Sequence, residues 1–119
     1  MTGPWFTNTI AGPYGVVTVG GEIDAHSAGG LREHLLIALC HLSPRLVLDM
    51  SKLTFIDSSG LAALVATWKL AEAGGGTLRL AGASDQVARK LRTTGLDQRL
   101  PLHPDVKAAI DECPEEHRT

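Results

Sequence analysis

The feature that most constrains the fold is the alternation of short apolar runs with segments whose leucines recur at helical spacing. One such stripe predicts an amphipathic helix that begins near residues 25–27 and ends before Pro44. Its members are Leu31, Leu35, Leu39 and Leu42. The compact apolar run at 45–50 follows directly and is typical of a strand buried on both faces. Repeated strand–helix units of this kind predict a largely parallel sheet.

The other segments extend this pattern and add an opening hairpin. The remaining expected elements are, in chain order, a strand at 5–10, a turn at 12–15, a β-branched strand at 16–19, a loop at 51–57, a helix over 61–71 stopped by glycines at 74–76, a strand at 77–81, a helix from Ser84 to Gly95, a weak strand at 99–102 and a helix from Pro104 to about residue 113. We therefore expect one α/β domain. Its sheet is mixed but mostly parallel, with four to five strands, and about four helices pack mainly on one side.

Composition excludes several functional classes. A chain of 119 residues suits one domain, and its formal charge of −2 lacks the basic surplus that nucleic-acid binding requires. We expect no membrane partner, because no apolar run approaches the ~20 residues that span a bilayer and no signal pattern begins the chain. Cys40 and Cys113 form no CxxC pair, which favours reduced thiols and a cytoplasmic location. His34 and His41 stand too far apart on one helix to share a metal ion, and we expect neither metal nor cofactor.

The most informative segment lies where the strand at 45–50 leads into the helix over 61–71. Asp57, Ser58, Ser59 and Gly60 occupy this junction. Asp57 or Ser58 could simply cap the helix, with Gly60 easing the turn. The same residues also present two hydroxyls at the carboxyl edge of the sheet, where partners and ligands of α/β proteins usually bind.

A resemblance to a known family bears on this choice. The run Phe-Ile-Asp-Ser-Ser-Gly-Leu at 55–61 resembles the signature of anti-sigma factor antagonists in the STAS domain family. Gly-Glu-Ile-Asp at 21–24 resembles a second landmark, and the Gly-Gly turn at 75–76 with Gly-Leu at 95–96 resembles a third. The likeness covers roughly residues 14–112. We therefore expect a STAS domain at 5–113, with flexible termini at 1–4 and 114–119.

The resemblance implies a switch that depends on one serine. Ser58 would be phosphorylated by an anti-sigma factor that is also a serine kinase. The unphosphorylated chain would bind that kinase and release a sigma factor, and a metal-dependent serine phosphatase would reset the switch. The residues expected at the partner surface are Glu22, Ile23, Asp24, Asp57, Ser58, Ser59 and Gly60. On this view the chain is a substrate and ligand rather than an enzyme, and it has no phosphate-binding loop of the nucleotide-binding type.

Elementary chemistry is consistent with such a switch. Backbone N–H groups and the dipole at a helix start tolerate a phosphate, so the domain should stay folded. Glu22, Asp24 and Asp57 predict an acidic patch, on which about two further negative charges would repel a docked partner. The basic face at 89–92 is expected to be a solvated helix surface that could pair with an acidic partner.

Other functions stay open on the sequence alone. The same edge could bind a nucleotide or anion as a small-ligand sensor, or the domain could serve a signalling or lipid-transport complex without a sigma factor. His26 near Ser58 would suggest a hydrolase, but the chain lacks the Gly-x-Ser-x-Gly turn of such enzymes.

Overall fold

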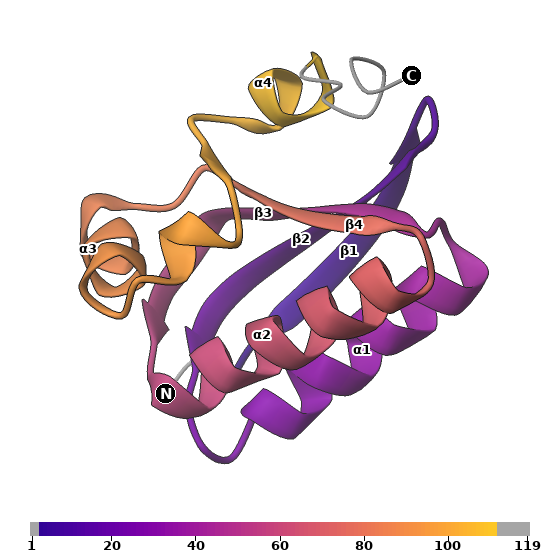
Figure 1. Cartoon of the computed structure of the whole chain (residues 1–119). Helices are drawn as coiled ribbons and strands as arrows, with labels where there is room; N and C mark the ends of the chain where they lie inside the picture. Colours follow the sequence, from indigo (N-terminus) through magenta and orange to yellow (C-terminus); the bar gives the residue numbers. More distant parts are fainter. Residues whose placement is uncertain (1–2, 112–119) are drawn as a thin grey trace.

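A computed structural model describes residues 3–111 of the chain (Figure 1). Of the termini expected to be flexible, only Gly3 and Pro4 are among the described residues. The elements are β1 (Trp5–Ala11), β2 (Tyr14–Ile23), α1 (Ala28–His41), β3 (Arg45–Ile56), α2 (Ser58–Ala73), β4 (Thr77–Ala81), α3 (Asp85–Thr93), the 3-10 helix η1 (Leu96–Gln98), β5 (Leu102–His103) and α4 (Val106–Asp111). Their order agrees with the expected order, with η1 added.

The strands form one five-stranded sheet in the spatial order β1-β2-β3-β4-β5. β1 and β2 pair antiparallel through a two-residue connection in which Gly12 takes a φ of 61°. Every later neighbour pair is parallel. The prediction of a mixed, mostly parallel α/β sheet is confirmed.

The two faces of the sheet are covered unequally. The main core joins strand residues such as Leu48 and Leu80 to α1, α2 and α3, all on one face. Figure 1 shows α1 and α2 lying side by side beneath the sheet, with α4 above it. On the opposite face, Ala109 of α4 packs in a smaller cluster with Tyr14, Val16, Val47 and Ala81. Helices therefore pack mainly on one side, as expected, and α4 is the exception.

β3 has 12 residues, twice the length of its apolar run at 45–50. The prediction of a loop at 51–57 was therefore wrong, because residues 51–56 belong to the strand. β3 continues to Ile56 because the far end of β2 supplies a parallel backbone partner up to Ile23. Irregularities in the pairing shift the register along β2, and the buried residues Leu53 and Ile56 stand three apart instead of two. This spacing hides the period of two by which strands are found in a sequence.

The C-terminal elements differ from expectation by a few residues. The weak strand forms at Leu102–His103 rather than 99–102, because only the end of β4 offers it pairing. α4 begins at Val106 and not at Pro104. The carboxylate of Asp105 accepts the N–H of Ala108 at 2.8 Å and so caps the helix one residue after the proline. The expected end of this helix, near residue 113, lies outside the described residues.

Candidate functional site

The junction between β3 and α2 is ordered by an N-cap. Asp57 has extended backbone angles, and its Oδ1 accepts the N–H of Ser59 at 2.9 Å and of Gly60 at 3.2 Å. Two of the otherwise unpaired amides at the start of α2 are thereby satisfied. Of the two cap candidates in the sequence, Asp57 is the cap and Ser58 is the first residue of the helix.

The side chains after the cap face different surroundings. Ser58 is exposed, Ser59 is half-buried and Gly60 is buried. A Cβ on Gly60 would lie 2.5 Å from Cγ1 of Ile56 and 2.7 Å from Cγ2 of Ile23. Glycine is needed here because the first turn of α2 packs directly on the ends of two strands.

The end of β2 lies beside this junction. The backbone N–H of Asp57 donates to the carbonyl oxygen of Ile23 at 3.1 Å. Around this bond, Glu22 is exposed, Asp24 is half-buried and the Ile23 side chain is fully buried. The residues expected at the partner surface are thus brought together, with Ile23 contributing its backbone and its packing rather than a surface side chain.

Asp24 organises the turn that follows β2. Its Oδ1 accepts the N–H of His26 at 2.9 Å, and from Ser27 it accepts the N–H and the hydroxyl, each at 3.2 Å. Desolvation raises the pKa of Asp24, but these hydrogen bonds outweigh it and the pKa falls below its usual value. Asp24 is therefore an ionised, positioned carboxylate at this edge.

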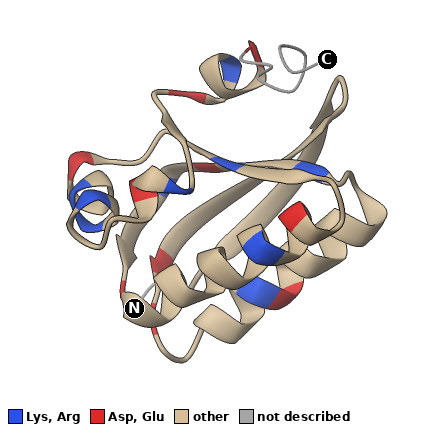
Figure 2. Ribbon diagram, in the orientation of Figure 1, with Lys and Arg blue, Asp and Glu red and all other residues tan. Residues whose placement is uncertain are grey.

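The structure also places cations beside Ser58, which the expectation of an acidic patch did not include. A hollow of about 350 Å³ separates the start of α2 from α3. Its lining consists of Asp57, Ser58, Leu61, Arg89, Lys90, Thr93 and Thr94. The blue bands on α3 in Figure 2 mark its basic residues. The surroundings of Ser58 are therefore mixed in charge, acidic toward β2 and basic toward α3.

Lys90 ties α3 to the same junction. Its Nζ donates to the carbonyl oxygen of Ile56 at 2.6 Å and lies 4.1 Å from the ring centroid of Phe55, which is 40% exposed. The sequence shows the basic face of α3 but does not by itself relate that face to Ser58. The available signal was topological: in a parallel sheet, the helix after one strand lies near the loop after its neighbour.

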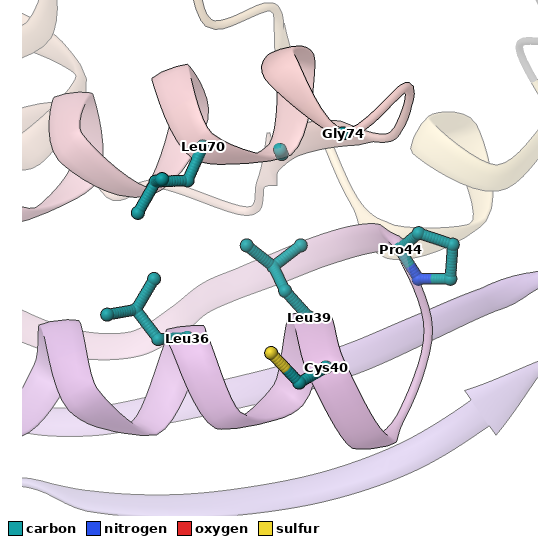
Figure 3. Close-up of a pocket in the computed structure, with 7 residues that line it drawn as sticks. Leu36, Leu39, Cys40, Pro44, Leu70 and Gly74 are labelled. Atoms are coloured by element: carbon teal, nitrogen blue, oxygen red, sulfur yellow. The ribbon is translucent and has the colours of Figure 1, made fainter.

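A second hollow lies at the other end of α2 (Figure 3). This groove of about 300 Å³ runs between α1 and α2 and is lined by Leu36, Leu39, Cys40, Pro44, Leu70, Ala71 and Gly74. Leu70 follows Ser58 by twelve residues, or about 18 Å of helix. The groove is apolar and separate from the Ser58 junction.

The part of the chain that the structure describes, residues 3–111, contains neither a metal-binding cluster nor a membrane-spanning helix. Within that range, no three His, Cys, Asp or Glu side chains gather where they could hold a metal ion. Nor is any helix in that range both long and apolar enough to cross a bilayer.

Comparison with known proteins agrees with this geometry. The STAS domain family model matches residues 7–109. The anti-sigma-B factor antagonist of Bacillus subtilis (strain 168) is 36% identical over 80 residues, which cover 67% of this chain and 72% of that protein. An anti-sigma factor antagonist from Mycobacterium paratuberculosis has a crystal structure similar to this one, with a TM-score of 0.81 at 29% identity over 90% of this chain and 91% of that one.

A third comparison shows similarity of fold alone. SpoIIAA, a Bacillus cell fate determinant solved in its phosphorylated form, has a TM-score of 0.68 at 22% identity, over 90% of this chain and 97% of that one. The same family is indicated by the sheet topology, by the adjacent 21–24 and 57–60 segments and by these comparisons. The chain belongs to the STAS domain family, and the relatives that it resembles in sequence are anti-sigma factor antagonists.

Proposed function

We propose that this protein is an anti-sigma factor antagonist switched by phosphorylation of Ser58. In the unphosphorylated state it binds a cognate anti-sigma factor that is also a serine kinase, and a sigma factor is released. The observation that carries the proposal is the exposed Ser58 at the start of α2, joined to the Glu22–Asp24 edge through the bond between Asp57 and Ile23. The names of the sequence relatives support the same function.

The switch follows from the position of the hydroxyl. A partner docked over Glu22, Asp24 and Ser58 removes water from this surface. A phosphoryl group there adds about −1.5 to −2 charges and considerable bulk. Since ~1.4 kcal/mol changes affinity tenfold, a few kcal/mol of repulsion and lost contacts suffice to release a submicromolar partner. Ser58 is not buried and Asp57 already caps the helix, so the domain has no need to unfold in the process.

The chain acts as substrate and ligand in this scheme, not as an enzyme. The kinase supplies ATP and transfers the phosphoryl group, and a metal-dependent serine phosphatase removes it. The exchange takes place in the cytoplasm, where both enzymes act on the same surface.

The test is phosphorylation of the full chain by its cognate kinase with ATP, followed by peptide mass spectrometry. We expect phosphate on Ser58, none on S58A, and unchanged modification of the matched variant S59A. Binding of the kinase should survive in S58A and be lost from the phosphorylated wild type. Phosphate on Ser59 alone, or none at all, would refute the proposal.

A small-anion sensor is the second candidate, favoured by the hollow of about 350 Å³ that Arg89 and Lys90 line. Calorimetry of the isolated protein with nucleotides or inorganic phosphate distinguishes the two functions. Saturable binding without a protein partner would favour the sensor. Stable binding only to a protein outside sigma regulation would instead indicate a different signalling complex.

A further inference from the structure

We propose that the side chains of Arg89 and Lys90 of α3 bind the phosphate of phosphorylated Ser58 through hydrogen bonds and charge. The inference rests on the proposed function, because it concerns the modified state of the same serine. Its basis is the hollow in which Ser58, Arg89 and Lys90 line one space between two helices. The phosphate would therefore be held within the domain, against α3, rather than left free in solvent.

Most of the backbone donors at the start of α2 are already engaged. The N–H groups of Ser59 and Gly60 are already taken by Oδ1 of Asp57. The Asp57 carboxylate also lines the hollow and repels a second anion there. A phosphate on Ser58 thus finds few free backbone donors on α2, and α3 is the basic element that lines the same hollow.

The two cations suit this role in different ways. Lys90 is held in place by the Ile56 carbonyl at 2.6 Å, and an ammonium has three N–H donors, so two can serve a further acceptor. Arg89 is exposed and long enough to move. Its planar guanidinium can donate two parallel hydrogen bonds to a phosphate.

Holding the phosphate against α3 changes the ionisation of the phosphate itself. The second pKa of phosphoserine is about 6, and neighbouring cations favour the dianion and lower it. The charged groups that line the hollow are Arg89 and Lys90 from α3 and Asp57 at the cap of α2. Glu22 and Asp24 flank Ile23 at the end of β2, and the carbonyl of Ile23 accepts the Asp57 N–H. The carboxylates raise this pKa and the cations lower it. Removing one cation should therefore shift the pKa measurably upward.

The experiment uses the full chain with phosphoserine incorporated at position 58 during translation. Phosphorus-31 NMR spectra are recorded from pH 4.5 to 8 at low ionic strength, where surface charges are least screened. We expect R89Q to raise the second pKa of the phosphoserine by about half a unit relative to wild type, with K90Q acting in the same direction. R92Q is the matched control, because Arg92 lies on the same helix and is exposed but does not line the hollow.

Two results would overturn the inference. One is an R89Q titration that coincides with wild type; the other is an R92Q shift as large as that of R89Q, which would reflect only the net charge of α3. Since the phosphoserine is installed without a kinase, the titration does not depend on whether a kinase modifies Ser58. Failure of the proposed function and failure of this inference are therefore separate outcomes.

Discussion

The backbone N–H of Asp57 donates to the carbonyl oxygen of Ile23 at 3.1 Å, and this bond joins the start of α2 to the end of β2. These residues stand 34 positions apart in the chain. Because one hydrogen bond fixes both segments, the cap carboxylate, Ser58 and the Glu22–Asp24 edge form a single surface. Under the proposed function, the partner docks on this whole surface, so a charge added at Ser58 changes its contacts with the Glu22–Asp24 edge as well.

Gly60→Ala should destabilise the protein. Its Cβ would approach Ile56 at 2.5 Å and Ile23 at 2.7 Å, so α2 must shift or the two isoleucines must leave their positions. We expect the free energy of unfolding in urea to fall by about 1–3 kcal/mol. Gly30→Ala in α1 is the matched control: its Cβ meets nothing within 4 Å, and it should raise stability by about 0.5–1 kcal/mol. Equal stability of the two variants would contradict this packing.

Asp57→Ala should remove the cap of α2. Loss of the bonds to Ser59 and Gly60 is expected to lower the free energy of unfolding by about 1 kcal/mol. Asp57→Asn keeps a side-chain oxygen that can accept these bonds and should cost less. Chemical denaturation of the three proteins checks the order, and an Asn variant as unstable as the Ala variant would show that charge, not capping, is the dominant contribution.

Ser58→Asp should separate folding from binding. The side chain is exposed and a negative charge is favoured in the first turn of a helix, so the free energy of unfolding should stay within about 0.5 kcal/mol of wild type. Kinase binding, measured by calorimetry, should weaken at least about tenfold, equivalent to ~1.4 kcal/mol. Ser58→Ala controls for loss of the hydroxyl and should keep the partner. Unfolding of the Asp variant would contradict a switch that acts by local charge.

His34 should make stability depend on pH near neutrality. Its ring stacks on Phe6 with centroids 4.4 Å apart, and its Nε2 lies 2.8 Å from Oδ1 of Asn8. Burial lowers the pKa of His34 below the usual histidine value of about 6.5. The unfolded chain therefore binds the proton more readily, and stability falls as the pH drops from 7.5 through 6.5 toward the lower folded value. His34→Gln should flatten this part of the stability curve in thermal melts between pH 7.5 and 5.5, and an unchanged slope would exclude His34 as its source.

Much of the fold could be predicted from local pattern because the relevant forces act between near neighbours in the chain. The leucine stripe of α1 is periodic, and its Leu31 and Leu35 are fully buried as that period requires. The cap at Asp57 depends on side chains and amides within three residues of each other. Such features follow from residue type and spacing without knowledge of the rest of the molecule.

The second half of β3 could not be predicted in this way. Residues 51–56 form strand only because β2 extends alongside them, and the irregular pairing removes the alternation that would have marked them. The charge around Ser58 has the same origin. Arg89 and Lys90 follow Ser58 by about thirty residues, and no local rule relates them to it.

The sequence by itself determined the α/β order and a helix start at the Asp57–Ser58 pair, since each depends on the periodicity or hydrogen bonding of adjacent residues. The structure showed that Asp57 is the cap and that Ser58 is exposed. Only the tertiary structure decided that this serine lies between an acidic strand end and a basic helix. Parallel pairing of β2, β3 and β4 brings these segments to one edge of the sheet, and the electrostatic field at a hydroxyl depends on distance in space rather than on separation along the chain.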